Sequence, residues 1–312
     1  MPSRIVFING GTGFIGKALC SDFLSRPCED THQTTVGSGT KLYVQTRHPN
    51  QHRHQSITFV SSYQNLPDDV VPNTIINLAG APIAEGRWTD RRKRIIRNSR
   101  VLLTDNLLNS VIQKGHTPEV LINASAVGFY GNCGDFCVDE DHSKGTGFAA
   151  DLCADWEASA QSFNRLGTRV CILRIGIVLG LGGGALAKLL PIFKLGLGGP
   201  IGDGEQWFSW VHKTDLLRLI TTMLGNARYS GVYNATAPNP VKQKDFAKAL
   251  GRELRRPAVL PTPSWLLTAI YGEMAKELLV EGQRVMPVKA EKDAFKFDYP
   301  QLDLALRDIL RH

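Results

Sequence analysis

The chain has 312 residues, 30 of them glycine, and its 36 Lys and Arg against 29 Asp and Glu leave a formal net charge of +7. A hydrophobic share of 43% with 21% charged residues is typical of a folded chain and excludes intrinsic disorder. No apolar run reaches the roughly eighteen residues of a membrane-spanning helix, so we expect no transmembrane segment. The first residues lead directly into a strand-like run, and none of the six cysteines forms a CxxC pair. We therefore expect a cytoplasmic protein with reduced thiols and no signal peptide.

Strand-like and helix-like segments alternate along the first 175 residues. The strand-like segments are residues 4–8, 42–46, 57–60, 74–78, 120–125 and 170–173. The helical patterns lie between them, at residues 14–25, 90–113 and 147–166. This alternation indicates an α/β fold of βαβ units, and right-handed crossovers make a doubly wound parallel sheet the simplest arrangement. Residues 26–40 are polar and rich in turn formers, so we expect an inserted surface loop there.

The character of the sequence changes after Arg174. Ten of the thirty glycines lie between residues 176 and 204, which predicts long loops beside a substrate. From about residue 240, helical patterns separated by prolines predict a small, mostly helical C-terminal region. We therefore expect one domain with its substrate loops at residues 1–240 and a small helical domain at residues 241–312.

Three glycines follow the first strand and open the first helix. Gly10, Gly13 and Gly16 have the spacing G-x-x-G-x-x-G. The first glycine permits a tight turn, the second lets the main chain approach a pyrophosphate, and the third lets the helix lie close to the strand. N–H groups at the start of the helix would then face the anion. The pattern predicts a dinucleotide site, and a structural turn without a ligand is the alternative.

The end of the second strand indicates which dinucleotide would bind. NAD sites place an acidic residue there for the ribose hydroxyls, whereas NADP needs a cation for its 2′-phosphate. Residues 41–67 contain no Asp or Glu, and the strand ends in Thr46 and Arg47. Arg47 can bind a phosphate bidentately, and Thr46 offers a hydroxyl. We predict NADP(H), with an ordinary surface arginine as the alternative for Arg47.

Small residues close the fourth strand in the sequence Asn77-Leu78-Ala79-Gly80. They would let the chain pass close to the adenine and ribose of the cofactor. A tight strand end packed on a helix is the alternative.

Most of the excess charge lies in one segment. Residues 87–100 contain seven cations and one acid, hence a net charge of +6. A nucleic-acid surface would interleave aromatic residues with cations on one face, and this run does not. We therefore expect most of these cations to be solvated, one or two to face the cofactor, and no nucleic-acid partner. Cys133 and Cys137, like the histidines at 48, 52 and 54, lack the further ligands of a metal site, so we expect no metal.

The whole pattern resembles the epimerase-family, atypical members of the extended short-chain dehydrogenases/reductases. The resemblance extends over nearly the full chain and is most specific at residues 196–204 and around Trp207 and Trp210. Its other motifs are residues 10–16, 46–47, 77–80, 87–89, 99–100, 125–131, 156–157, 173–180 and 281–284. It implies a Rossmann-like sheet with a short C-terminal domain of unknown function. It also implies cofactor contacts at Gly10, Thr12, Gly13, Phe14, Ile15, Gly16, Thr46, Arg47, Leu78, Ala79, Gly80 and Arg100.

In that superfamily a Ser or Thr ends the fifth strand, and a Tyr-x-x-x-Lys pair on the next helix supplies the general acid and base. Ser125 stands at the strand end, although a simple turn residue is the alternative. With Glu157 as the register mark, Ala149 and Cys153 occupy the Tyr and Lys positions, so the usual proton relay is absent. The atypical group commonly lacks this pair as well. Tyr130 is the second candidate polar group near the reacting carbon, with a structural role equally open.

Three functions are compatible with these residues. The first is an NADP-dependent oxidoreductase or epimerase for an unidentified small molecule, with Ser125 and Tyr130 near the nicotinamide and Trp207 and Trp210 at the substrate. The second is a regulatory protein that binds NADPH without turnover, which the missing relay allows. The third is an interaction protein linked to cell division, a label that some members of the group carry. We expect no membrane partner, and a homodimer is left open.

Overall fold

The computed structural model describes residues 4–25 and 40–311. The inserted loop predicted at residues 26–40 therefore lies outside the described residues, apart from its last position. The strands are β1 (Ile5–Asn9), β2 (Lys41–Gln45), β3 (Ile57–Val60), β4 (Thr74–Asn77), β5 (Val120–Ala126), β6 (Cys137–Val138), β7 (Arg169–Ile175), β8 (Ile177–Leu179), β9 (Trp207–Phe208), β10 (Trp210–His212), β11 (Gly231–Ala235), β12 (Val241–Lys242) and β13 (Arg284–Val285). The helices are α1 (Phe14–Ser25), α2 (Asp90–Asn98), α3 (Val101–Gln113), α4 (Phe148–Gln161), α5 (Gly184–Lys194), α6 (Lys213–Gly225), α7 (Gln243–Leu254), α8 (Ser264–Tyr271), α9 (Glu273–Ala275), α10 (Val288–Lys292) and α11 (Leu302–Arg311).

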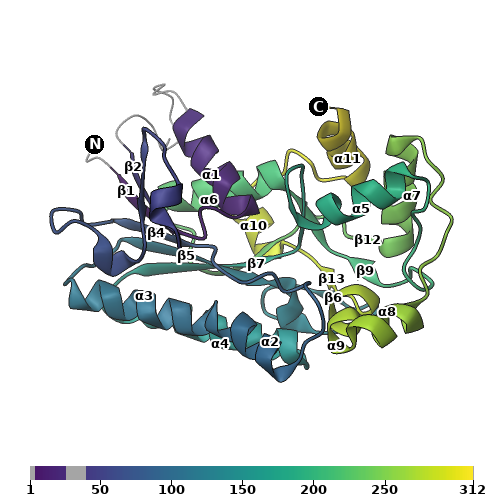
Figure 1. The fold of residues 1–312 in the computed structure, drawn as a ribbon, viewed down its shortest axis with the longest axis horizontal. Coiled ribbons are helices and arrows are strands. Elements are labelled where there is room, and N and C mark those ends of the chain that lie inside the picture. The colour runs from purple at the N-terminus through teal and green to yellow at the C-terminus, as the bar shows by residue number, and fades with distance from the viewer. Residues whose placement is uncertain (1–3, 26–39, 312) are drawn as a thin grey trace.

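Seven strands form one parallel sheet in the order β3-β2-β1-β4-β5-β7-β11 (Figure 1). The chain builds from β1 to one edge and then from β4 to the other, so the strand order reverses between β1 and β4. Ligands of doubly wound sheets bind at such a reversal, beside the carboxyl ends of the strands. The predicted Rossmann-like sheet is confirmed. Its reversal places residues 10–16 and 78–80 at the same edge, which we call the nucleotide edge.

Helices cover both faces of this sheet. Val6 and Ile8 of β1 pack in one core cluster with residues of α1 and α6, whereas Phe7 packs in another with residues of α3. Successive side chains of a strand point to opposite faces, so a strand covered on both sides is apolar throughout. Figure 1 shows α3 and α4 on one side of the sheet and α1 and α6 on the other.

The single basic helix predicted at residues 90–113 is wrong, because α2 and α3 are separate helices. The break falls at Ser99 and Arg100. The Ser99 hydroxyl donates to the carbonyl of Ile96 at 2.8 Å and accepts the main-chain N–H of Ala81 at 2.9 Å. The segment that leaves β4 therefore holds the end of α2 in place.

The long loops predicted between residues 176 and 204 are wrong for β8 and α5. The apolar residues of α5 recur at helical spacing, and Leu186, Leu190 and Phe193 are buried. The glycines that suggested a loop lie instead at a close contact. A Cβ atom on Gly183 would lie 2.7 Å from the ring of Phe14, so glycine is needed there for packing.

The C-terminal region is mostly helical, as predicted, but short strands tie it to the rest of the chain. β12 pairs with β9, and β13 pairs with β6. One core cluster joins α5 to α7 and α11 through Leu190, Phe246 and Leu306. The sequence patterns do not predict α6 or β11, and β11 completes the large sheet.

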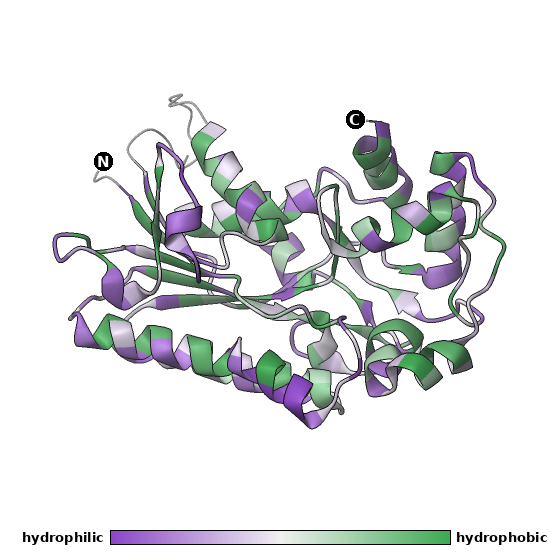
Figure 2. Cartoon of the chain, in the orientation of Figure 1, coloured by the Kyte–Doolittle hydropathy of each residue, from purple (hydrophilic) through white to green (hydrophobic). Residues whose placement is uncertain are grey.

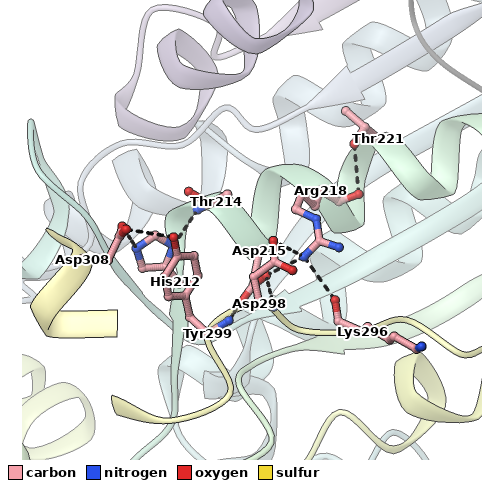
Figure 3. Close-up of polar contacts among 9 residues, drawn as sticks. All are labelled: His212, Thr214, Asp215, Arg218, Thr221, Lys296, Asp298, Tyr299 and Asp308. Carbon is pink, nitrogen blue, oxygen red and sulfur yellow. Dashed lines mark hydrogen bonds and ion pairs between the residues drawn. The ribbon is translucent and has the colours of Figure 1, made fainter. Parts of the chain in front are cut away.

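Two buried side chains near the start of α6 hold the last part of the chain (Figure 3). Asp215 accepts the main-chain N–H groups of Asp298 and Tyr299, each at 2.9 Å. The ring of His212 lies against the ring of Tyr299, with centroids 3.9 Å apart. Its Nε2 atom lies 3.3 Å from Oδ2 of Asp308 in α11. These contacts fix the C-terminal segment on the sheet domain. Among the described residues, every helix is too short or too polar to span a bilayer.

Candidate cofactor and active site

The turn between β1 and α1 contains close approaches that require glycine. Gly10 has a φ of +82°, and a Cβ atom there would lie 2.7 Å from the main-chain nitrogen of Ala79. A Cβ atom on Gly16 would overlap the carbonyl oxygen of Gly10. The main-chain N–H of Gly13 donates to the same carbonyl at 3.0 Å. The three predicted glycines thus form one tight turn at the nucleotide edge.

The first turn of α1 leaves hydrogen-bond donors for an anion. Among the described residues, the main-chain N–H groups of Phe14 and Ile15 have no partner. The first turn holds no acidic residue, and Gly13 is exposed in front of it, with Thr12 half-buried beside it. Unpaired N–H groups at a helix start attract phosphate. The residues present therefore fit the pyrophosphate of a dinucleotide.

Thr46 and Arg47 lie beside this turn. β1 and β2 pair in parallel with Asn9 opposite Gln45, so the residues that follow the two strands lie at the same edge. The main-chain N–H of Thr46 donates to the last residue of β3 at 2.9 Å. The Arg47 side chain is exposed and has no hydrogen-bond or ion-pair partner in the described chain. A free cation at this position fits a 2′-phosphate.

Residues 78–80 lie on the other side of the turn. The main-chain N–H of Leu78 donates to the carbonyl of Asn9 at 2.8 Å. Arg100 covers Gly80, because a Cβ atom there would lie 2.7 Å from its guanidinium carbon. The guanidinium also lies 5.4 Å from the ring of Trp156, and burial lowers the pKa of Arg100 to about 10. The structure thus brings Leu78, Ala79, Gly80 and Arg100 together with the glycine turn.

A row of buried asparagines crosses the sheet at the nucleotide edge. Asn9, Asn77 and Asn123 stand in register on β1, β4 and β5. The Asn77 side chain donates to Oδ1 of Asn123 at 2.7 Å. Within the described residues, Nδ2 of Asn9 and Oδ1 of Asn77 have no partner. Buried polar atoms are nearly always paired, so these two atoms are a further sign that a polar ligand completes the site.

The basic segment at residues 87–100 is partly paired within the protein. The pairs are Arg92 with Glu85, Lys93 with Glu273, and Arg97 with Asp155. Arg100 is the member that lies at the nucleotide edge. Within the described residues, no group of three His, Cys, Asp or Glu side chains could hold a metal.

Ser125, the predicted residue at the end of β5, is buried and faces α4. Its hydroxyl donates to Oε1 of Glu157 at 2.6 Å. Glu157 is held in turn by Arg174 of β7, whose Nε and Nη2 donate to its two oxygens at 2.9 Å each. Bidentate pairing of this kind offsets part of the cost of removing both charges from water. The proton of the Ser125 hydroxyl is therefore engaged inside the protein.

Tyr130 belongs to the same network. Its hydroxyl donates to Oδ1 of Asn234 at 2.7 Å and accepts from Nη1 of Arg174 at 3.0 Å. Burial raises the pKa of Tyr130 to about 12, against the opposing effect of Arg174. The phenol therefore stays protonated near neutral pH and can act there as a donor but not as a base.

Helix α4 has no proton-transfer group at the two positions where the resemblance places Tyr and Lys. Ala149 and Cys153 are both buried. Cys153 lies against Ser125, and burial raises the pKa of its thiol to about 11. The thiol is therefore neutral at physiological pH.

Two family models match this chain. One, described as the NAD dependent epimerase/dehydratase family, matches residues 6–236, and the other, described as a domain of unknown function (DUF1731), matches residues 262–309. The chain belongs to the NAD dependent epimerase/dehydratase family. The glycine turn, the sheet and the network around Ser125 all lie within the epimerase match.

Several epimerase-family proteins are similar to the chain over almost its whole length. Epimerase family protein SDR39U1 homolog, chloroplastic, of Arabidopsis thaliana is 39% identical over 310 residues, which cover 98% of this chain and 86% of that protein. Epimerase family protein MT2273 of Mycobacterium tuberculosis is 36% identical over 308 residues, which cover 98% of this chain and 97% of that protein. The crystal structure of human epimerase family protein SDR39U1 (isoform 2) with NADPH is 30% identical, has a TM-score of 0.86, and covers 99% of this chain and 100% of that chain.

A carboxylate from the DUF1731 match caps the N-terminus of α4 in the epimerase match. Oε1 of Glu277 accepts the N–H of Phe148 at 3.0 Å, and Oε2 accepts the N–H of Ala149 at 2.9 Å. A Cβ atom on Gly147 would lie 2.7 Å from Oε1, so glycine makes room for the cap. Burial raises the pKa of Glu277, although the two main-chain donors act to lower it.

Sequence reasoning missed this cap and the pairing of Glu157 with Arg174. The signals in the sequence were Gly147 just before a helix, and the charged residues Glu157 and Arg174 inside apolar segments. Neither signal identifies the residue that each group would contact. The expectation that Trp210 lines a substrate pocket is wrong, because its side chain is fully buried and donates to the carbonyl of Asn239 at 3.1 Å.

Proposed function

We propose that this epimerase-family chain binds NADP(H) and uses it as an oxidoreductase or epimerase on a small molecule. The observation that carries the proposal is the juxtaposition of the tight glycine turn with Arg47 at the end of β2, a cation that has no partner among the described residues. The NADPH in the human SDR39U1 structure, a relative 30% identical to this chain, supports the choice of cofactor.

The cofactor would be held along the nucleotide edge. The turn of Gly10, Gly13 and Gly16 would bind the pyrophosphate together with the N–H groups of Phe14 and Ile15, which have no partner in the described part of the chain. The other contacts would come from Thr12 in the turn, Thr46 and Arg47 at the 2′-phosphate, Leu78, Ala79 and Gly80 beside the adenosine, and Arg100. When bound, the nicotinamide supplies or accepts a hydride.

Ser125 and Tyr130 are the polar side chains proposed to serve the reaction. Both lie where β5 ends, and Arg174 connects them through Glu157. Because Tyr130 stays protonated, its contribution is to orient its neighbours and to donate a hydrogen bond. Ser125 would orient the substrate after its hydroxyl turns away from Glu157.

A second candidate function is NADPH binding without turnover. The observation that favours it is α4, where Ala149 and Cys153 offer no acid or base. NADPH oxidation with any member of a carbonyl substrate panel, slowed in Ser125→Ala, separates the first function from the second. Tight NADPH binding with no turnover, and with no effect of Ser125→Ala, favours the second.

The test of cofactor choice is Arg47→Glu. Loss of a charge-assisted phosphate contact should raise the Kd for NADPH about tenfold or more and leave the Kd for NADH nearly unchanged. Titration of intrinsic protein fluorescence with each cofactor measures both constants. Arg53→Glu is the matched control, since Arg53 is exposed on the same connection between β2 and β3. An equal change for both cofactors, or none for NADPH, contradicts the role of Arg47.

A further inference from the structure

The end of the molecule farthest from the large sheet carries side chains that a folded protein normally buries. Leu195 is 74% exposed, Val259 is 73% exposed and Trp265 is 71% exposed. We call these three residues, together with Leu197, Leu260 and Ile270, the terminal apolar patch. Exposed apolar patches of this kind mark contact sites for a partner or a lipid surface.

The residues of the patch come from two parts of the chain that lie next to each other. The main-chain N–H of Leu260 donates to the carbonyl of Gly198 at 3.2 Å, so the segments that carry Leu197 and Val259 run side by side. A Cβ atom on Gly202 would lie 3.4 Å from the side chain of Ser264, which places the start of α8 next to them.

Helix α8 contributes Trp265 and Ile270 to this surface. Its sequence SWLLTAIY contains no charge, and none of its eight residues is buried. Figure 2 colours α8 as largely hydrophobic. An apolar helix on the surface without a covering element has lost much of the stabilisation that burial would give it.

The two segments that carry the patch contain charges of one sign. Residues 184–202 and 254–272 contain four cations, Lys188, Lys194, Arg255 and Arg256, and no Asp or Glu. Lys194, Arg255 and Arg256 form no side-chain hydrogen bond or ion pair within the described chain. Of the carboxylates that flank these segments, Glu205 pairs with Lys244, Glu253 with Arg307, and Glu273 with Lys93. Asp203 accepts the main-chain N–H of Glu205 at 3.0 Å.

We propose that the terminal apolar patch docks this protein on an anionic phospholipid surface. Side chains more than 70% exposed protrude from the protein, and lipids can close around them, whereas a protein partner would need a matching pocket for each. Trp265 is suited to the headgroup region, and the unpaired cations around the patch complement negative lipid. This proposal departs from the expectation of no membrane partner, which rested on the lack of a membrane-spanning segment.

Co-sedimentation with vesicles tests the proposal on the full chain. Vesicles of phosphatidylcholine mixed with phosphatidylglycerol should carry the protein down, whereas phosphatidylcholine alone should bind it at least about tenfold more weakly. Added salt should reduce the bound fraction. Trp265→Ser with Leu197→Ser should lower partitioning about tenfold or more, and Arg255→Glu with Arg256→Glu should lower it on anionic vesicles.

The matched control is Leu102→Ser with Ile112→Ser, which removes two exposed apolar side chains from α3 and should leave vesicle binding unchanged. Circular dichroism and the NADPH titration show whether each variant folds, and Trp265→Ser alone serves if the double variant does not. Absence of binding to anionic vesicles overturns the proposal, as does equal loss in the α3 control. A wild-type dimer that does not bind vesicles and becomes a monomer in Trp265→Ser would show that the patch joins two copies of the chain.

Discussion

At the scale of single residues, the buried pair of Glu157 and Arg174 organises the interior of the candidate active site. Two hydrogen bonds of 2.9 Å join the pair, and the guanidinium carbon lies 3.4 Å from the ring centroid of Phe129. Ser125 and Tyr130 are both attached to it. The pair therefore fixes the distance between α4 and β7 and sets where the two polar candidates lie.

Removing one partner of this pair should be costly. Glu157→Gln leaves the Arg174 charge buried without compensation, so we expect the free energy of unfolding to fall by about 3–5 kcal/mol. Urea denaturation measures it. Asp155→Asn breaks an exposed pair on the same helix and should cost about 1 kcal/mol or less. A double variant with Arg174→Met should recover part of the loss, and equal costs for Glu157→Gln and Asp155→Asn would contradict the role of the pair.

At the scale of elements, residues at the N-terminus of α6 attach the C-terminal segment to the sheet (Figure 3). Nδ1 of His212 accepts the main-chain N–H of Thr214 at 3.1 Å, so this nitrogen carries no proton. Burial lowers the pKa of His212, although Asp308 and Asp215 act to raise it. Protonation would place a second donor against the N–H of Thr214 and would end the cap.

The titration of His212 should make the free energy of unfolding depend on pH. In the unfolded chain the imidazole of His212 is protonated below about pH 6.5, whereas in the folded chain its pKa is lower. The neutral imidazole therefore stabilises the fold fully above about pH 6.5, and this stabilisation is lost as the pH falls. Urea midpoints should therefore decrease from about pH 8 to about pH 5.5 in the wild type. His212→Asn keeps a capping side chain without the titration and should show a smaller decrease. His54→Asn is the exposed control, and parallel profiles of the wild type and His212→Asn would refute the assignment.

At the scale of the whole molecule, the C-terminal region is built into the structure at several separate places. β12 and β13 pair with strands from the middle of the chain, Glu277 caps α4, and Asp215 holds residues 298–299. Four core clusters contain residues from both sides of residue 240. We propose that residues 1–240 and 241–312 are two domains that unfold together in one cooperative transition.

Truncation after residue 240 tests this coupling. It removes α7 and α11 from a core that also contains α5, and it leaves Asp215 without its two main-chain donors. We expect a large loss of stability, seen as a lower Tm or the absence of a cooperative transition in circular dichroism. A truncated chain that melts at the temperature of the full chain would show that the region beyond residue 240 is an independent attachment.

Local patterns predicted what depends on local contacts. The apolar run of β1 and the glycines after it identify the strand and the turn, because both signals lie within a dozen residues. The break at Ser99 could not be predicted, since it depends on Ala81. Helix α5 could not be predicted because glycines at its start suggested a loop. Those glycines are needed for packing against the ring of Phe14, which is far away in the sequence.

The same distinction applies to the candidate site. The choice of Arg47 follows from its place at a strand end, and its role stays a prediction. Its side chain is exposed and has no partner among the described residues. The buried hydrogen bonds of Ser125 and Tyr130 depend on Glu157, Arg174 and Asn234, which lie on other elements. A sequence shows that these residue types are present but not which of them meet.

The cap on α4 has a consequence for the order in which the protein is made. A chain leaves the ribosome from its N-terminus, and domains begin to fold as they emerge. The nucleotide edge uses residues up to Asn123, whereas the cap on Phe148 and Ala149 waits for Glu277, translated 128 positions after Ala149. All residues of the nucleotide edge are therefore synthesised while α4 still lacks its cap, and the candidate active site reaches its final form only when synthesis is nearly finished.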